Sequence, residues 1–294
     1  MREVTSSHRQ QATSAIWEDR SVSNAISVRH GEFGRASIYQ LDSTIITHAH
    51  REGHLIFYID GADARLEVGD QPASVSHSFG AAVSPWEPHS FHLPVGQRQL
   101  CLVLYIKPRW FLQNDASSEF ALRFGSPVLE MTPEITDFVR RLTSLLLENE
   151  DHAQFDKLLF GLTKASFDQS WLRSGDGCRT DALLRYNDFR VRRSLRIIQD
   201  YVGETMEMEE LARLVGLSRP HFFKLFKQNM GVTPNVYINT LRSERAIDFL
   251  LTGDKTITDI AFDLGFSSQA SFTRFFSSNV GIAPSDYRRV AHVN

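Results

Sequence analysis

The last hundred residues contain two copies of one short pattern, ELARLVGLS at residues 210–218 and IAFDLGFS at residues 260–267. Each copy is an apolar stretch that runs into a glycine, Gly216 in the first and Gly265 in the second. Glycine readily takes the left-handed backbone conformation that ends a helix. A short helix, a tight turn and a second helix are therefore predicted twice, which is the helix-turn-helix plan. Ser218 is expected to cap the second helix of the first unit, and Thr256-Ile-Thr-Asp259 is a capping-box pattern in the second unit.

The repeat continues beyond these two stretches. The second helix of each unit and the segment after it match at a spacing of 50 residues: Phe222 with Phe272, Phe226 with Phe276, Gly231 with Gly281, Pro234 with Pro284, and Tyr237 with Tyr287. Phenylalanines four positions apart give each second helix one buried face. Because a solenoid usually needs three or more repeats, two copies predict a pair of modules.

A longer helix is expected between the two units. It begins at Pro234, runs to about Leu251 and is ended by Gly253. A helix of this length spans roughly 27 Å. A stiff connector of that size would hold two recognition helices about one DNA turn apart, which is ~34 Å.

The region from Phe189 to Arg289 resembles the AraC/XylS family of transcription regulators. Besides the two stretches above, the resemblance rests on FFKLFKQNMG (222–231), LRSERA (241–246), FTRFF (272–276) and GIAPSDYR (281–288). It implies double-stranded DNA, a small-molecule effector, RNA polymerase and a second copy of the chain as partners. Activation is the expected mode, and the residues leave repression open.

Side chains near the start of a recognition helix read base edges in this architecture. Once the buried positions are set aside, nine outward positions remain as DNA-contact candidates: Arg219, Pro220, Phe223, Lys224 and Lys227 on the first helix, and Gln269, Ala270, Thr273 and Arg274 on the second. Gln pairs with adenine and Arg with guanine. The resemblance places Lys224, Gln269 and Arg274 at base-contacting positions.

The sequence leaves open the role of Phe223 and the identity of the phosphate contacts. Phe223 either contacts a thymine methyl group or widens the hydrophobic core. The phosphate-contact candidates are Thr205, Thr256, Arg242 and Arg245. Both arginines lie within a helix, where such side chains are often solvated or paired with Glu.

The first half of the chain has a β pattern. From about Gly31 to Ile106, short apolar runs alternate with turn clusters at residues 60–63 and 68–72. Strands at this spacing predict a sandwich or barrel.

Histidines gather in the predicted strands. The spacing His48-x-His50-x3-His54, followed by Pro85-x3-His89, resembles a cupin signature, although that motif usually has Glu at the third position and a Gly where this chain has Glu87. Two-residue alternation puts His48 and His50 on one face of a strand, and His54 and Tyr58 on one face of the next strand. If both faces point inward, these imidazoles and His89 converge.

Three interpretations of the cluster stand side by side. The first is an effector pocket, lined by His48, His50, His54, Tyr58, Trp86 and His89. The second is a site for Zn, Cu, Fe or Ni, bound by His48, His50, His54 and His89. In the third, the histidines are only structural.

The fold class is therefore two-domain, with an N-terminal all-β cupin-like barrel, appended helices, and a C-terminal all-α double helix-turn-helix. The expected ranges are an effector-binding domain at 1–130, amphipathic dimerisation helices at 131–173, a linker at 174–187 and the DNA-binding domain at 188–294. Leu142, Leu145 and Leu146 share one apolar helix face. That face either packs on its own barrel or binds a second copy.

Composition fits a cytoplasmic regulator. Of the 294 residues, 42% are hydrophobic, the two cysteines lack disulfide or metal spacing, and a membrane-length apolar run is absent. Residues 190–294 hold 14 basic and 11 acidic side chains against 18 and 24 elsewhere, as expected for a nucleic-acid-binding part. No enzyme activity or cofactor is expected. The alternatives are a metal-binding cupin enzyme fused to a DNA-binding module and a ligand-independent dimeric regulator.

Overall fold

The computed structural model describes residues 23–114, 122–148, 152–173, 188–200 and 207–293. The N-terminal part consists of short strands: β1 (Asn24–Gly31), β2 (Gly34–Leu41), β3 (Ile45–His48), β4 (Gly53–Gly61), β5 (Ala64–Val68), β6 (Gln71–Val75), β7 (Phe79–Val83), β8 (His89–His92), β9 (Gln99–Ile106) and β10 (Val128–Glu130). The predicted all-β region is confirmed, and it begins earlier than expected because Ala25 and Val28 are also buried.

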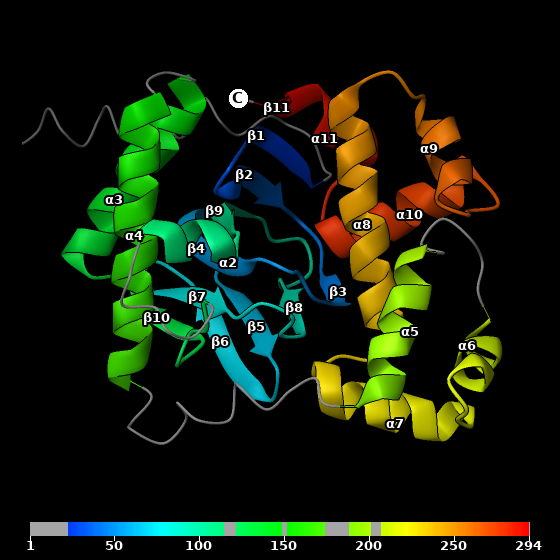
Figure 1. The fold of residues 1–294 in the computed structure, drawn as a ribbon. Helices are drawn as coiled ribbons and strands as arrows, with labels where there is room; N and C mark the ends of the chain where they lie inside the picture. The colour runs from blue at the N-terminus through cyan, green and yellow to red at the C-terminus, as the bar shows by residue number, and fades with distance from the viewer. Residues whose placement is uncertain (1–22, 115–121, 149–151, 174–187, 201–206, 294) are drawn as a thin grey trace, which may run out of the picture.

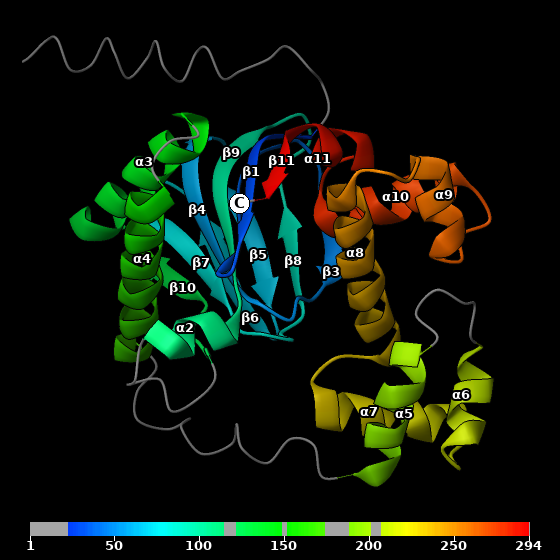
Figure 2. The same cartoon turned by 45° about the horizontal axis from the view of Figure 1, so that its top comes forward.

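The strands form two sheets (Figure 2). The larger has the order β10-β7-β4-β9-β2-β1-β11, where β11 (Ala291–Val293) comes from the C-terminal end of the chain, and the smaller has the order β3-β8-β5-β6. Both sheets contribute side chains to one core, such as Leu66 and Phe91 from the smaller and Ile56 and Val103 from the larger. In β5 the buried positions alternate with exposed ones, as in a half-buried strand.

Three helices, α2 (Pro108–Asn114), α3 (Pro133–Glu148) and α4 (His152–Arg173), lie beside the larger sheet (Figure 1). Their apolar side chains form a second core with the outer face of that sheet. Leu142 and Leu146 are buried in this core, and Leu145 packs against it. The prediction that this helix face binds a second copy is therefore wrong for Leu142 and Leu146, because the chain's own strands cover them.

The C-terminal part is helical: α5 (Phe189–Asp200), α6 (Met208–Leu214), α7 (Arg219–Met230), α8 (Pro234–Thr252), α9 (Ile257–Asp263), α10 (Gln269–Val280) and α11 (Pro284–Val290). The two predicted helix-turn-helix units are α6–α7 and α9–α10, and both turn glycines have a positive φ, 76° at Gly216 and 78° at Gly265. The capping box at Thr256 is confirmed. Ser218 occupies the N-cap position of α7 without the expected side-chain hydrogen bond.

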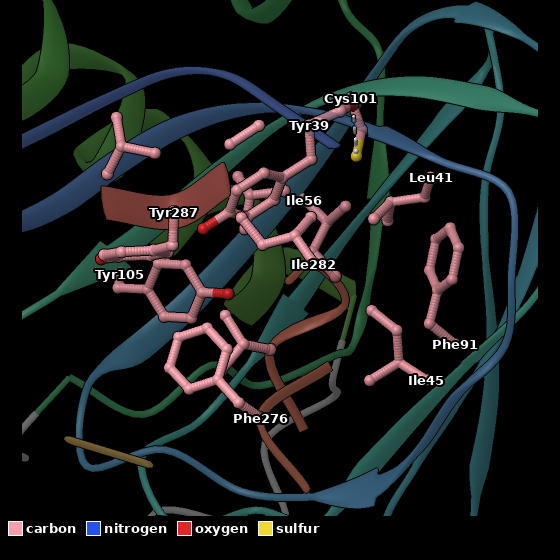
Figure 3. Packing of buried hydrophobic residues seen from close by; sticks show 14 of the residues in the cluster. Tyr39, Leu41, Ile45, Ile56, Phe91, Cys101, Tyr105, Phe276, Ile282 and Tyr287 are labelled. Atoms are coloured by element: carbon pink, nitrogen blue, oxygen red, sulfur yellow. Dashed lines mark hydrogen bonds between the residues drawn. The ribbon is translucent and has the colours of Figure 1, made fainter. Parts of the chain in front are cut away.

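The second unit shares a core with the β-sheets. Figure 3 shows Phe276, Ile282 and Tyr287 packed among strand residues that include Tyr39 and Tyr105. In addition, β11 pairs in parallel with β1, joining Val28 to Ala291. This attachment of the helical part to the sheets was not predicted.

Two predictions lie outside the described residues, namely the linker at 174–187 and the phosphate contact at Thr205. Within the described part of the chain, the helices are all too short or too polar to cross a membrane.

Candidate DNA-binding surface and histidine cluster

The outer face of α7 is polar and exposed. Phe222 and Phe226 are buried on the inner side of the helix. Four of the predicted contact residues are exposed on the opposite side: Arg219, Pro220, Lys224 and Lys227. Phe223 is half-buried and contacts Phe222 edge to face, at 6.2 Å between ring centroids. This position matches the core-widening interpretation and still leaves part of the ring accessible.

Arg219 is held beside α6. Its Nη1 lies 3.1 Å from Glu209 Oε1, and its guanidinium lies 5.3 Å from the centroid of the Phe223 ring. Both ionic side chains are more than half exposed. Because exposed ion pairs contribute little stability, a phosphate or base could replace Glu209 as the partner of Arg219 at small cost.

The outer face of α10 presents the equivalent surface of the second unit. Gln269, Ala270 and Arg274 are exposed, and Thr273 is half-buried. Gln269 Oε1 accepts a 2.7 Å hydrogen bond from the Thr258 hydroxyl, which orients the amide. Arg274 Nη2 lies 3.4 Å from Ser271 Oγ, so the guanidinium extends along the helix surface.

The phosphate-contact candidates differ in their surroundings. Thr256 Oγ1 takes part in the capping box by accepting from the Asp259 backbone N–H. Arg242 is half-buried with its guanidinium 5.9 Å from the Phe266 ring centroid, and burial lowers its pKa. Arg245 is exposed. Packing therefore explains Arg242 better than a phosphate contact does.

Four histidines converge between the two sheets. His48 ends β3, His54 lies on β4 and His89 begins β8. The centroid of the His48 ring lies 4.2 Å from that of His89 and 4.8 Å from that of His50, while His54 lies 5.0 Å from His89. The predicted convergence is confirmed. The expectation that His50 lies on the same strand as His48 is wrong, because β3 ends at His48 and His50 follows in the loop.

Backbone carbonyls fix the tautomers of two rings. His48 Nδ1 lies 2.7 Å from Ile46 O, and His89 Nδ1 lies 3.0 Å from Glu87 O. Since a carbonyl can only accept, both Nδ1 atoms donate, which leaves a lone pair on each Nε2. His54 Nδ1 lies 3.1 Å from His89 Nε2 and is then the donor. The Nε2 atoms of His50 and His54 are buried without a hydrogen-bond partner in the described structure.

Burial keeps the imidazoles neutral. It lowers the pKa of His48 to about 4 and holds the pKa values of His50, His54 and His89 well below the ordinary value of 6.5, with the neighbouring histidines adding to the effect. Neutral imidazoles with exposed lone pairs can bind a metal ion or accept hydrogen bonds from a ligand. One ring nitrogen each from His48, His50 and His89 lies within 4.8 Å of the other two.

Of the other two predicted pocket residues, Tyr58 lies away from the rings, and Trp86 adjoins them because its backbone N–H donates to His50 O. Tyr58 lies four positions beyond His54 along β4, about 13 Å at the usual strand rise, and its hydroxyl donates to Gly61 O. Trp86 stacks on Tyr237 of α8, with 4.7 Å between ring centroids and 21° between ring planes. Trp86 and His89 also line a cleft of about 520 Å³ between the strands and the first helix-turn-helix unit.

Sequence reasoning missed the residues that connect the cluster to the helices. Thr240 Oγ1 of α8 donates to Ala49 O at 2.9 Å, and Arg51 Nε lies 3.0 Å from Glu244 Oε2 of the same helix. Arg35 of β2 donates to the Tyr287 hydroxyl at 3.0 Å. A signal was available for Arg35, since an arginine in a predicted core strand is rarely buried without a partner.

Comparison with known proteins supports the assignment of the helical part. A helix-turn-helix domain family matches residues 211–290. An uncharacterized HTH-type transcriptional regulator of Staphylococcus aureus is 39% identical over 102 residues, which are 35% of this chain and 14% of that protein. The chain thus spans a small part of the length of this curated relative.

Two further similarities extend over most of the chain. The probable transcriptional regulator LumQ of Photobacterium leiognathi is 22% identical over 253 residues, which cover 84% of this chain and 94% of LumQ. The crystal structure of an apo ToxT variant from Vibrio cholerae has a TM-score of 0.53 and 17% identity, covering 89% of this chain and 98% of that one. The latter similarity establishes the shared fold, with a sheet-rich N-terminal part and a helical C-terminal part.

Proposed function

We propose that this chain, whose C-terminal part is an AraC-type helix-turn-helix domain, is a transcription regulator that binds specific DNA sequences and responds to a small ligand. The observation that carries the proposal is the pair of exposed polar faces at repeat-equivalent positions of α7 and α10. Lys224 and Arg274 are 50 residues apart in the sequence, and both are exposed on the side opposite to buried phenylalanines.

The expected complex places α7 and α10 in successive major grooves. The helix α8 has 19 residues, which gives it a length of about 28 Å. Base contacts are assigned to Lys224, Gln269 and Arg274, with Arg219, Pro220, Phe223, Lys227, Ala270 and Thr273 at the edges of the two contact surfaces.

Selection of bound fragments from a random-sequence DNA pool tests the proposal. We expect one enriched sequence with two protected segments about 10 base pairs apart on one face of the duplex. The double variant Lys224→Ala/Arg274→Ala should lose this binding. The matched control Arg140→Ala/Lys164→Ala also removes two exposed cations, on α3 and α4, and should retain it. Failure to enrich any sequence, or equal losses in both double variants, would disprove the proposal.

Ligand control is assigned to the histidine cluster and the adjoining cleft. The support is their position, since Trp86 contacts both the cleft and α8. A ToxT structure, similar in fold to this chain, is described as bound to an unsaturated fatty acid. In this chain Trp86 stacks on Tyr237 of α8, the helix that connects the two helix-turn-helix units. This contact favours a regulatory role for the cluster over a catalytic one.

The remaining partners follow from the resemblance. We infer a cytoplasmic homodimer that contacts RNA polymerase. Because Leu142 and Leu146 are covered, the dimer surface must use other residues. Sedimentation of the purified protein measures the oligomeric state, and a monomer at micromolar concentration with and without DNA would exclude the dimer.

A further inference from the structure

We propose that His48, His50 and His89 bind one divalent transition-metal ion, and that α8 senses whether the ion is present. The inference deepens the proposed function, because it makes the metal ion the ligand to which the regulator responds. It rests on the hydrogen bonds of the His48 and His89 rings and on the buried His50 Nε2 that has no partner in the described structure. It also rests on the contacts of residues 49–51 with α8.

Two of the three rings donate to the backbone as metal-binding histidines usually do. In such sites the second ring nitrogen of each ligand usually donates to a carbonyl or carboxylate, which fixes the ring and leaves the other nitrogen available. His48 and His89 already have this arrangement, through Ile46 O and Glu87 O. The Nε2 atom of His48 carries a lone pair that can bind the ion. The Nε2 atom of His89 accepts from His54 Nδ1 at 3.1 Å, so the ion would have to replace this hydrogen bond.

The third ligand explains an otherwise costly feature. His50 Nε2 is buried and has no hydrogen-bond partner in the described structure, although a buried polar atom without one is destabilising. The ligand nitrogens of the three residues lie within 4.8 Å of one another. Nitrogens bound tetrahedrally to Zn²⁺ at 2.0–2.1 Å lie about 3.3 Å apart, so small ring movements would close the site.

The donor set indicates the class of metal. Three neutral imidazoles suit Zn²⁺, Co²⁺, Ni²⁺ or Cu²⁺ rather than Mg²⁺ or Ca²⁺, which prefer oxygen ligands. Three protein ligands leave an open position for a solvent-derived ligand. The cleft that is lined by His89 and Trp86 offers access from solvent.

The nearby cation Arg35 is separated from the His54 ring by Tyr105. Its guanidinium lies 3.6 Å from the centroid of the Tyr105 ring, and the His54 ring stacks on Tyr105 at 4.4 Å. At such short distances the two groups must occupy opposite faces of Tyr105. The aromatic ring therefore lies between Arg35 and His54.

Contacts on both sides of His50 reach α8. Ala49 O accepts from Thr240, Arg51 pairs with Glu244, and His50 O accepts at 2.7 Å from the backbone N–H of Trp86. Trp86 in turn stacks on Tyr237, and Trp86 has a left-handed φ of 62°, an unusual conformation for a bulky residue. Movement of the His50 ring toward an ion would therefore shift a backbone segment that contacts Thr240 and Glu244 of α8 and, through Trp86, Tyr237.

Metal titration of the full-length chain tests the site. Metal-free protein should bind one Co²⁺ per chain, with a visible absorption spectrum typical of nitrogen ligands, and Zn²⁺ should displace it. His50→Ala and His89→Ala should each weaken binding by about 100-fold or more, since even residues that only orient ligands contribute ~10–100-fold. His92→Ala is the matched control, because His92 follows three positions after His89 on β8 and so faces the opposite way.

The coupling to α8 is measured on the same samples, without DNA. Zn²⁺ should change the tryptophan emission of the wild type, and this change should be absent in Trp86→Phe. Hydrogen exchange of the α8 amides should also respond to Zn²⁺ in the wild type and in His92→Ala, but not in His50→Ala.

The outcomes separate this inference from the proposed function. A wild type that binds no Co²⁺, Ni²⁺ or Zn²⁺ at micromolar concentration, or a His50→Ala/His89→Ala double variant that binds as the wild type does, overturns the metal site. The Co²⁺ spectrum of the wild type reports nitrogen ligands directly. Whether the metal site exists is therefore decided even if a variant folds poorly. Metal binding without any change at Trp86 or α8 overturns the sensing. Failure to select DNA would disprove the regulator and leave the metal titration as it stands.

Discussion

The two helix-turn-helix units have the same sequence plan and different surroundings. The first unit, with α5, has its own core around Phe222 and Phe226, to which the β part adds Ala49 and the partly buried Trp86. The second unit has no separate core, since Phe272 and Phe276 belong to the cluster that also contains strand residues such as Ile45 and Tyr105. The comparison teaches that α10 is built into the β-sheet part of the molecule, whereas α7 is attached mainly through α8.

The largest test of this difference uses the matched phenylalanines. Phe226→Ala and Phe276→Ala each remove a fully buried ring and should cost ~3–5 kcal/mol of the free energy of unfolding. Phe276→Ala should also lower hydrogen-exchange protection in β1 and β3, because it opens the shared core. Phe226→Ala should affect α5–α7 and the start of α8, where Tyr237 contacts the Phe226 ring, and should leave the strands protected. Equal loss of strand protection in both variants would show that the units do not differ in this way.

A second comparison concerns DNA readout by equivalent positions. Arg274→Ala should cost ~1–3 kcal/mol of binding free energy at one base pair, because it removes a planar donor pair suited to guanine. The binding free energy lost in Lys224→Ala should depend less on which base pair is present, since an ammonium is a point charge. Binding is measured on the selected site and on single-base variants. A uniform loss on all sequences would place Arg274 on a phosphate, and unchanged binding would exclude the contact.

A third test probes how closely α10 approaches the strands. Gly281 and Gly253 both follow a helix with a positive φ, 89° and 84°. Alanine in that conformation costs roughly 1–2 kcal/mol at either position. Gly281→Ala should cost more than Gly253→Ala, because its Cβ would lie 2.8 Å from Ile45 Cδ1 of β3, whereas nothing lies within 4 Å at Gly253. Chemical denaturation compares the two, and equal costs would argue against tight docking.

The smallest expected effect is a pH dependence of the contact between α8 and the strands. Burial raises the pKa of Glu244 to about 8, Arg51 and Arg35 oppose the rise, and Glu52 and Asp248 add to it. Because the docked carboxyl has a pKa above its ordinary 4.5, the folded state holds the proton more tightly than the unfolded state. Stability from this group is therefore greatest below pH 4.5 and is lost as the pH rises toward 8.

Glu244→Gln tests this pH dependence, since glutamine does not titrate. The variant should gain stability relative to the wild type between pH 5.5 and pH 8.5, as measured by thermal unfolding. A difference between the two proteins that stays constant, or shrinks as the pH rises, would contradict the shift.

Part of the candidate site was predictable, for a local reason. Two-residue spacing and strand patterns brought His48, His54 and His89 together, because side chains alternate along a strand. The same rule misplaced His50, since the strand ends before it, and it kept Tyr58 near His54 although the two lie four positions apart along the strand. The contacts of Ala49 and Arg51 with α8 join residues almost 200 positions apart, and no local pattern encodes such a pairing.

By itself the sequence determined the elements that depend on near neighbours. The turn glycines, the Thr256 capping box, the phenylalanine faces of α7 and α10 and the bounds of α8 all follow from spacings of three to four residues, where helix geometry fixes which side chains meet. Only the tertiary structure decided which unit docks on the sheets, how Tyr287 meets Arg35 and that β11 pairs with β1. Hydrophobicity establishes that a face is buried, while its partner is chosen by the shape and polar groups of surfaces distant in the chain.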